Sequence, residues 1–315
     1  MDPAIVCRGL SKSFGARAAV RSLDLAVDAG SIVGLLGPNG AGKTTVIRVL
    51  TTILAPDSGS FAIAGAPHLQ PERIRRRVGV LPESSGFPGG ATGEQALTFH
   101  ARLFGQSRSE ARATAQRLLA HVGLSDRATS LVSRYSRGMR QRLGIARALV
   151  NQPEVVFLDE PTLGLDPAGQ RQVLELIASI AREHGSTVVL STHLLYEVER
   201  VCDRVVILNQ GRVVADGTVR EVARLAAAPR QARVQLAAGG LDAAMTALSD
   251  SDAVRTVSAA PAADELVVEF AETTRAEDAG ARILQRLLDA RIGVVGFELE
   301  RGRLSDAFLA LTADS

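Results

Sequence analysis

The sequence has few of the residues that mark secreted, metal-binding or membrane-embedded proteins. It contains two cysteines, Cys7 and Cys202. These are too few for a disulfide framework and lack the spacing of metal ligands, so we expect reduced thiols in a cytoplasm. No apolar run approaches the roughly 18 to 20 residues of a membrane span, and Met1 begins no basic segment followed by an apolar one. We therefore expect a soluble chain that is not secreted.

An excess of charge of one sign is also absent. The formal net charge is +2 over 315 residues, which argues against a dedicated nucleic-acid surface, so we expect no nucleic-acid partner. Hydrophobic residues make up 46% of the chain, enough to bury a full core in two domains of unequal size.

Lysine is scarce, because only two of the 36 lysine and arginine residues are lysines, Lys12 and Lys43. Lys43 lies in a match to the G-x-x-x-x-G-K-[ST] pattern of phosphate-binding loops. A compact ammonium fits between nucleotide phosphates where a planar guanidinium would be too wide. The segment therefore predicts phosphate binding, and its residues are Gly37, Pro38, Asn39, Gly40, Ala41, Gly42, Lys43, Thr44 and Thr45.

The backbone of this loop fits that chemistry. Gly37 and Gly42 allow tight turns that bring N–H groups against phosphate oxygens. An apolar strand is predicted over 32–36, running into the loop, and a helix over about 43–54, leaving it. The unpaired donors of the helix N-terminus would then face the anion.

Three side chains at the start of the predicted helix would carry the contacts to a nucleotide. Lys43 would bridge the β- and γ-phosphates, and Thr44 would offer its hydroxyl to Mg²⁺. Thr45 would add a further donor to the phosphates.

A second site is predicted about a hundred residues further on. The segment 154–160 is a short apolar run that ends in Asp159 and Glu160, typical of a buried parallel strand that delivers acids at its carboxyl end. Ligands bind at that edge in open α/β sheets. Asp159 is placed to hold Mg²⁺, and Glu160 to polarise the water that attacks the γ-phosphate.

Three further segments surround these carboxylates in the sequence. Ser136 precedes an Ala-rich helical pattern, so it is predicted to be an N-cap, a position that can equally receive a phosphate. The segment 163–167 reads as a turn into a helix, with Asp166 before a proline. A strand over 187–190 leads to His193.

Taken together in this order, the segments resemble the ATP-binding cassette family, the ATPase subunits of ABC transporters. The resemblance covers residues 4 to about 220 and rests on five ordered motifs. It implies an α/β fold: a P-loop NTPase cassette with a RecA-like core, an antiparallel β-subdomain and a helical subdomain at about 85–150. The cassette would occupy residues 1–225 and use ATP and Mg²⁺.

The resemblance also implies roles for single residues. Two cassettes would sandwich two ATP molecules head to tail, and Ser136 and Gly138 would reach the γ-phosphate bound to the partner. His193 looks like the switch histidine that contacts the γ-phosphate, and Asp166 like the residue that links the two sites. Phe14 matches the aromatic that stacks on adenine.

Two departures from the family pattern carry information. Tyr135-Ser136-Arg137-Gly138-Met139 stands where the common signature is Leu-Ser-Gly-Gly-Gln. Glu83 stands where many members have glutamine, and a carboxylate can still ligate Mg²⁺ or orient water. Both variants look like the drug- and antibiotic-export branch of the family.

That branch implies a separate membrane partner. An integral membrane permease would insert a coupling helix at a surface formed by 83–92 and the helical segments through Leu103 and Leu119, with Phe87 and Pro88 at the contact. The chain would then lie peripherally on the cytoplasmic face of the cell membrane, as a homodimer or as a heterodimer with a second cassette.

A smaller domain is predicted after the cassette. The segment 226–232 reads as a linker. Over 233–315, alternating and helical patterns in the order β-α-β-β-α-β predict a small α+β ferredoxin-like domain, followed by a last helix. Such an extension would dock on the partner, stabilise the dimer or be a purely structural appendage.

Other function classes fit less well. A P-loop GTPase needs an Asn-Lys-x-Asp motif, which neither Lys12 nor Lys43 provides, and a small-molecule kinase would have no use for the signature segment. The alternatives that stay open are an ABC ATPase acting on ribosomes or nucleic acid, and the ATPase of an ABC importer. The variant signature and the C-terminal extension favour export.

Overall fold

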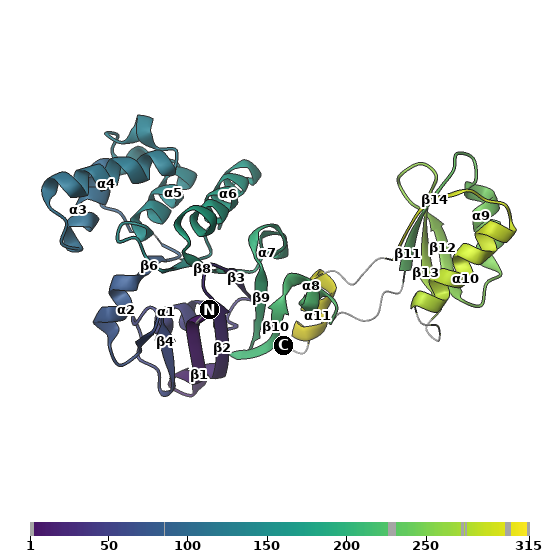
Figure 1. Ribbon diagram of the computed structural model, residues 1–315, viewed down its shortest axis with the longest axis horizontal. Coiled ribbons are helices and arrows are strands. Elements are labelled where there is room, and N and C mark those ends of the chain that lie inside the picture. Colours follow the sequence, from purple (N-terminus) through teal and green to yellow (C-terminus); the bar gives the residue numbers. More distant parts are fainter. Residues whose placement is uncertain are drawn as a thin grey trace. The chain divides into compact units, whose positions relative to one another are not determined.

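The computed structural model (Figure 1) describes residues 3–84, 86–225, 231–271, 274, 276–299 and 304–313. Its contacts divide the chain into two compact units. The larger unit comprises Pro3–Val219 together with Leu311–Ala313, and the smaller unit comprises the described part of Arg220–Ala310. Among the described residues, no helix has both the length and the apolarity needed to cross a membrane.

A six-stranded sheet forms the centre of the larger unit, in the order β10-β9-β3-β8-β7-β6. The pairs between β9 and β6 are parallel, and β10 is an antiparallel edge strand. Every residue of the central strands β3, β7 and β8 is buried, which explains their continuous apolar sequences. The strands are β3 (Ile32–Leu36), β6 (Val78–Leu81), β7 (Val155–Asp159), β8 (Thr187–Thr192), β9 (Arg204–Asn209) and β10 (Arg212–Thr218).

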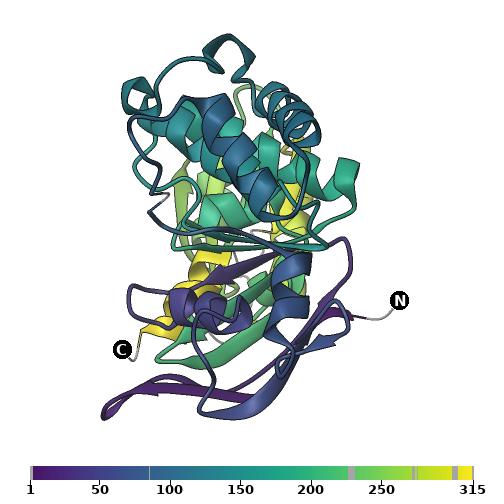
Figure 2. The same cartoon turned by 90° about the vertical axis from the view of Figure 1, so that its left-hand side faces the viewer.

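A second, antiparallel sheet lies beside the first and shares a hydrophobic core with α1 and one face of the central sheet. Its order is β2-β1-β4-β5, and the two long strands form a hairpin. In Figure 2 this hairpin lies at the opposite end of the unit from the helical subdomain. The elements are β1 (Pro3–Phe14), β2 (Arg17–Asp28), α1 (Lys43–Leu50), β4 (Ser58–Ile63), β5 (Ala66–Pro67) and α2 (Pro71–Arg77).

The other face of the central sheet packs against α5, α6 and the helical subdomain in a second core. Two of these helices begin with a capping box, at Thr92 and Ser107, which pairs N–H groups that a helix start leaves free. The elements are α3 (Gly93–Leu103), α4 (Arg108–His121), η1 (Ser125–Arg127), η2 (Val132–Arg134), α5 (Arg137–Ala148), α6 (Pro167–His184) and α7 (Leu195–Val201). The predicted architecture of core, β-subdomain and helical subdomain is therefore confirmed.

The helix after the phosphate loop is shorter than predicted. It ends at Leu50 rather than at about Leu54. The hydroxyl of Thr51 donates to the carbonyl of Ile47, and Thr52 adopts a left-handed backbone with φ 61°. A left-handed residue ends an α-helix because its carbonyl leaves the helical direction.

The smaller unit contains a four-stranded antiparallel sheet in the order β12-β13-β11-β14. Alternate residues of β11 and β13 are buried in one core with α9 and α10, so both helices cover the same face. This arrangement confirms the predicted β-α-β-β-α-β order. The elements are α8 (Val219–Ala223), β11 (Gln231–Leu236), α9 (Leu241–Ser249), β12 (Val254–Ala259), β13 (Glu265–Phe270), α10 (Ala276–Asp289), β14 (Val294–Leu299) and α11 (Leu304–Thr312).

The end of the chain returns to the larger unit. The side-chain amide of Asn209 on β9 donates to the carbonyl of Leu311 at 3.4 Å. The smaller unit begins at Arg220 and ends at Ala310, so it starts earlier and ends earlier than the C-terminal domain predicted over 233–315. Of the predicted linker at 226–232, residues 226–230 lie outside the described part of the chain.

Candidate functional site

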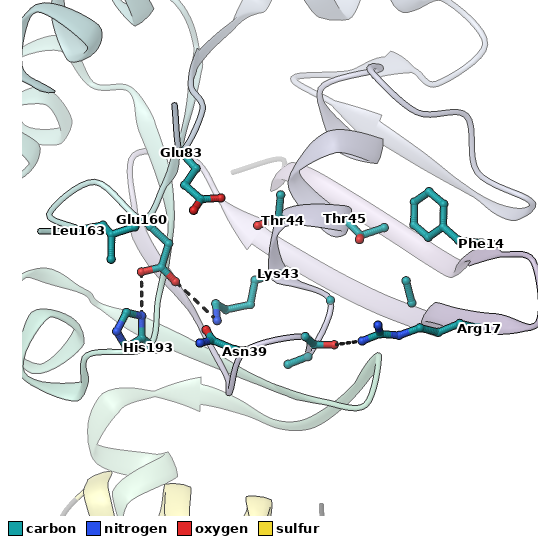
Figure 3. A pocket seen from close by; sticks show the side chains of 14 residues that line it. Phe14, Arg17, Asn39, Lys43, Thr44, Thr45, Glu83, Glu160, Leu163 and His193 are labelled. Carbon is teal, nitrogen blue, oxygen red and sulfur yellow. Dashed lines mark hydrogen bonds and ion pairs between the residues drawn. The ribbon is translucent and has the colours of Figure 1, made fainter. Parts of the chain in front are cut away.

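A pocket of about 660 Å³ opens at the carboxyl ends of β3, β7 and β8. The parallel register places Leu36 beside Thr192 and Asp159 beside Ser191, so segments far apart in sequence meet at one sheet edge. In Figure 3, Phe14 and Arg17 lie at one end of the pocket, and Glu160 and His193 at the other. The lining residues are Phe14, Arg17, Ala19, Asn39, Gly40, Ala41, Gly42, Lys43, Thr44, Thr45, Glu83, Glu160, Leu163 and His193.

The glycines of the loop are required by close backbone packing. A Cβ on Gly37 would lie 2.4 Å from the carbonyl oxygen of Leu208. Gly42 has φ 110°, and a Cβ there would lie 2.4 Å from the carbonyl oxygen of Ala19. Gly42 is also the N-cap of α1 and has no side chain to cap it. The first N–H groups of α1 therefore remain available to an anion in the pocket.

Lys43 is almost fully buried beneath the loop, with 6% of the residue exposed. Its ammonium donates to the carbonyl oxygens of Gly37 at 2.7 Å and Pro38 at 3.4 Å. It also lies 3.6 Å from Oε1 of Glu160. The carbonyl partners carry no net charge and the carboxylate is distant, so the charged oxygens of a phosphate can replace them. Gly37 and Pro38 thus contribute through their carbonyls rather than by lining the pocket.

Thr44, Asp159 and Glu83 bring together side-chain oxygens, the type of ligand that Mg²⁺ prefers. The hydroxyl of Thr44 donates to Oδ1 of Asp159 at 3.1 Å, and the hydroxyl of Ser191 donates to the same oxygen at 2.5 Å. Glu83 lines the same pocket from the end of β6 and is exposed. Among the described residues there is no cluster of three or more His, Cys, Asp or Glu side chains that would form a complete metal cage. Mg²⁺ fits such a site because it is usually held by one or two protein oxygens together with nucleotide phosphates and water.

Glu160 and His193 form a direct pair at the far end of the pocket. Oε2 of Glu160 lies 2.9 Å from Nδ1 of His193, a contact drawn in Figure 3. Glu160 has a left-handed backbone with φ 48°. Its N–H is held by the carbonyl of Ser191 at 3.2 Å and by the hydroxyl of the same residue at 3.0 Å. A strained residue held by its surroundings is a frequent feature of catalytic sites.

The sequence analysis missed Arg17, which lines the pocket, and Ser191, which is buried and holds the two carboxylate residues in place. Arg17 lies at the same end as Phe14, and its guanidinium contacts the carbonyl oxygen of Gly40 at 3.5 Å. Ser191 directs Asp159 and Glu160 through the bonds described above. The available signals were the position of Arg17 three residues after Phe14, and that of Ser191 two residues before His193. Phe14 itself is 50% exposed, which leaves a ring face free for stacking.

Ser136, Gly138 and Asp166 are not brought to this pocket. They line a separate pocket of about 320 Å³. Ser136 and Asp166 are the N-caps of α5 and α6, and their side-chain oxygens accept from the N–H groups of Met139 and Gly169. The predicted N-cap role of Ser136 is therefore confirmed. Its predicted contact is with a nucleotide bound to a partner chain, and within one chain Ser136 lies in a different pocket from the phosphate loop.

Arg137 joins the two segments of this second pocket. A Cβ on Gly164, which has φ 68°, would lie 2.4 Å from the guanidinium carbon of Arg137. The arginine therefore occupies the space above the turn that leads to Asp166. The side chain that replaces the usual Gly at this signature position therefore lies against Gly164, in the turn before α6.

The chain is similar to known proteins in sequence and in fold. A family model described as ABC transporter matches residues 20–163. The chain is 36% identical to the daunorubicin resistance ATP-binding protein DrrA3 of Streptomyces coeruleorubidus, over 99% of this chain and 97% of that protein. It is 41% identical to the Nod factor export ATP-binding protein I of Paraburkholderia xenovorans, over 69% of this chain and 71% of that protein.

A solved structure extends the comparison to three dimensions. It is a dimeric, post-hydrolysis state of an ATP-binding cassette bound to ADP and phosphate. The TM-score is 0.63 at 25% sequence identity, covering 69% of this chain and 99% of that one.

Proposed function

Because this chain belongs to the ABC transporter family as an ATP-binding cassette protein, we propose that it hydrolyses ATP to drive export through a separate membrane permease. The observation that carries this proposal is the similarity to a daunorubicin resistance ATP-binding protein over 99% of the chain, which includes the smaller unit as well as the cassette. The first pocket offers the side chains that ATP binding and hydrolysis require. The cargo class we infer is hydrophobic drugs or antibiotics.

The residues of the pocket support a division of labour during hydrolysis. Phe14 would stack on adenine, and Lys43 with the N–H groups of the loop and of α1 would hold the phosphates. Thr44 and Asp159 would hold Mg²⁺, with Glu83 within the same pocket. When bound, the ion neutralises charge on the β- and γ-phosphates.

Glu160 is the residue that we assign as general base. Its carboxylate would accept a proton from the attacking water, and the imidazole of His193, 2.9 Å away, would orient that carboxylate and contact the γ-phosphate. Binding of phosphate oxygens to Lys43 would release the 3.6 Å contact between Lys43 and Glu160. Glu160 would then be free to face water.

The separate position of Ser136 and Gly138 supports a head-to-tail dimer. A hydroxyl and an N–H group at the start of α5 form an anion site, and in one chain they lie away from the phosphate loop. In a dimer with twofold symmetry, the pocket of each chain would be closed by the α5 start of its partner.

Exposed apolar side chains on the helical subdomain support contact with a permease. Phe99, Leu103 and Phe104 are 60%, 65% and 47% exposed at the end of α3. Phe87, predicted at this contact, is partly buried against the core, and the guanidinium of Arg147 lies 4.7 Å from its ring centre. We therefore place the permease contact at Phe99, Leu103 and Phe104, with Phe87 as support beneath it. The chain would bind the cytoplasmic face of the membrane through this surface.

The test is co-purification of the tagged chain from its native host after mild detergent extraction of membranes. We expect a polytopic membrane protein in stoichiometric amount, and its loss with Leu103→Ser. The control is Leu69→Ser, because Leu69 is 80% exposed but lies outside the helical subdomain. Ribosomal or nucleic-acid partners without a membrane protein would overturn the transport assignment and leave the ATPase site intact.

A further inference from the structure

Glu197 on α7 is a buried acid that the mechanism above does not use. It has 0% exposure, and Asp159 is the other buried acid among the described residues. Its Oε2 has no hydrogen-bond partner in the described part of the chain. Burial of a carboxyl group costs free energy that an apolar side chain of the same size would not. This position therefore calls for an explanation beyond stability.

The contacts of Glu197 lead to the segment that carries Glu160. The hydroxyl of Thr162 donates to Oε1 of Glu197, and Thr162 is buried, two residues after Glu160. The N–H of Leu163 donates to the carbonyl of Glu160 at 3.2 Å, and the N–H of Leu165 donates to that of Thr162 at 3.1 Å. Thr162 thus anchors the turn that holds Glu160 in its left-handed conformation.

A second contact leads to the segment that carries His193. The side chain of Thr192, the residue before His193, lies close enough to Glu197 to lower the pKa of its carboxyl group. The oxygen of the Thr192 hydroxyl accepts from the N–H of Leu194 at 3.0 Å, which leaves its hydrogen free to donate. The carboxyl group of Glu197 is therefore hydrogen-bonded to a threonine of the segment that carries Glu160 and lies beside a threonine of the segment that carries His193.

The electrostatics of Glu197 agree with this position. Burial raises its pKa most strongly, whereas the neighbouring hydroxyl groups of Thr162 and Thr192 lower it. The charge of Glu160 raises the pKa further, whereas His193 lowers it. Glu197 is thus close enough to both residues to sense their charges.

We propose that Glu197 is a positioning residue for ATP hydrolysis, which holds Thr162 through a hydrogen bond, lies beside Thr192 and so fixes Glu160 and His193 relative to each other. The proposal rests on the proposed function, since it assigns Glu197 to the same reaction. Outer contacts of this kind typically change activity by about 10- to 100-fold when removed, without touching the substrate. A small error in the orientation of the general base is enough to slow hydrolysis, because the attacking water must lie in line with the γ-phosphate.

The test compares full-length Glu197→Leu, Glu197→Gln and Thr162→Val in ATP turnover, ATP affinity and thermal unfolding. Glu197→Leu is expected to lower kcat by about 10- to 100-fold. The Kd for ATP should stay within about threefold and the melting temperature should be unchanged or higher, because Leu removes a buried carboxyl. Glu197→Gln should recover most of the rate, since the amide oxygen still accepts from Thr162.

Thr162→Val keeps the side-chain shape and provides a second test if Glu197→Leu does not fold. It should lower kcat as well. A variant with both Glu197→Leu and Thr162→Val should have a kcat only slightly lower than either single variant, because both changes break the same hydrogen bond. Glu199→Ala is the matched control, as Glu199 is exposed on the same helix and should retain the wild-type rate.

Full activity in Glu197→Leu, or an equal loss of ATP affinity and stability, would overturn the positioning role. No improvement in Glu197→Gln over Glu197→Leu would do the same. A different result would count against the proposed function, namely that the wild-type chain hydrolyses no ATP, or hydrolyses it equally well without Glu160. The failure of the positioning role and the failure of the proposed function are therefore distinguishable.

Discussion

Glu160 shows how several weak constraints act on one side chain. Its backbone is strained at φ 48°, its carboxylate lies between Lys43 and His193, and its N–H is held by Ser191. A left-handed conformation costs an L-residue about 1–2 kcal/mol. The surrounding bonds offset that cost and hold the carboxylate at the end of the pocket.

The first residue-scale prediction concerns the base. Glu160→Gln keeps the size of the side chain but cannot accept the proton, so we expect ATP hydrolysis to fall by about 100-fold or more while ATP still binds. Turnover and bound nucleotide are measured on the same sample. Glu154→Gln is the control, because Glu154 lies at the opposite end of β7 and pairs with Arg77 at 3.4 Å. Ordinary turnover in Glu160→Gln would remove Glu160 from the catalytic role.

A second residue-scale prediction concerns the loop backbone. Gly42→Ala places a Cβ 2.4 Å from the carbonyl of Ala19, so the loop must shift and we expect ATP binding to be lost. Gly30→Ala is matched in backbone, with φ 76°, but meets nothing within 4 Å. It should lower the free energy of unfolding by only about 1 kcal/mol and retain ATP affinity. Equal ATP affinities in the two variants would contradict the role given to close packing at Gly42.

Helix starts are the elements that shape both pockets. The first N–H groups of α1 face the phosphate loop, while α5 and α6 begin at Ser136 and Asp166 beside the second pocket. Each helix start presents partly unpaired donors and a positive partial charge. The site is therefore built from element termini that the parallel sheet and its helices place in two groups.

The element-scale prediction separates capping from nucleotide contact. Ser136→Ala and Ser107→Ala each remove an N-cap hydroxyl, from α5 and α4, and each should cost about 1 kcal/mol of stability. Only Ser136→Ala should also lower ATP turnover, because Ser107 lies on the exposed start of α4. Chemical denaturation and ATPase rates provide the two measurements. A parallel loss of turnover in both variants would mean that Ser136 acts only as a cap.

At the scale of the whole molecule, the proposed dimer would join two pockets that lie apart in one chain. The phosphate loop, Glu160 and His193 line one pocket, and Ser136, Gly138 and Asp166 line another. Head-to-tail pairing would complete two sites at once. The smaller unit has its own core, and the chain returns from it to the larger unit at Leu311.

The whole-molecule prediction uses complementation. Lys43→Ala and Ser136→Ala chains should each be inactive or nearly so alone. A mixed dimer contains one site with both defects and one intact site. Mixing equal amounts should therefore restore about a quarter of the wild-type rate, since half of the dimers are mixed and each has one of two sites intact. No recovery on mixing, with both variants shown to dimerise, would rule out sharing of a site between chains.

Local patterns allowed most of the fold and much of the candidate site to be predicted. Strand 32–36, the acidic strand end at Asp159 and the N-cap at Ser136 were correct because each depends on a few neighbouring residues. The end of α1 was predicted wrongly. The helix stops before a left-handed residue, Thr52, and a threonine does not mark such a position in the sequence as a glycine would.

The sequence by itself determined which chemical groups are present and their order: the phosphate loop, the signature segment, Asp159, Glu160 and His193. Only the tertiary structure decided which of them meet. The pairing of β3 with β8, and of β8 with β7, joins strands that are distant in the chain, and this brings Ser191 to Asp159 and Glu197 to Thr162. Long-range pairing of this kind depends on packing of the whole sheet, and no short sequence window records it.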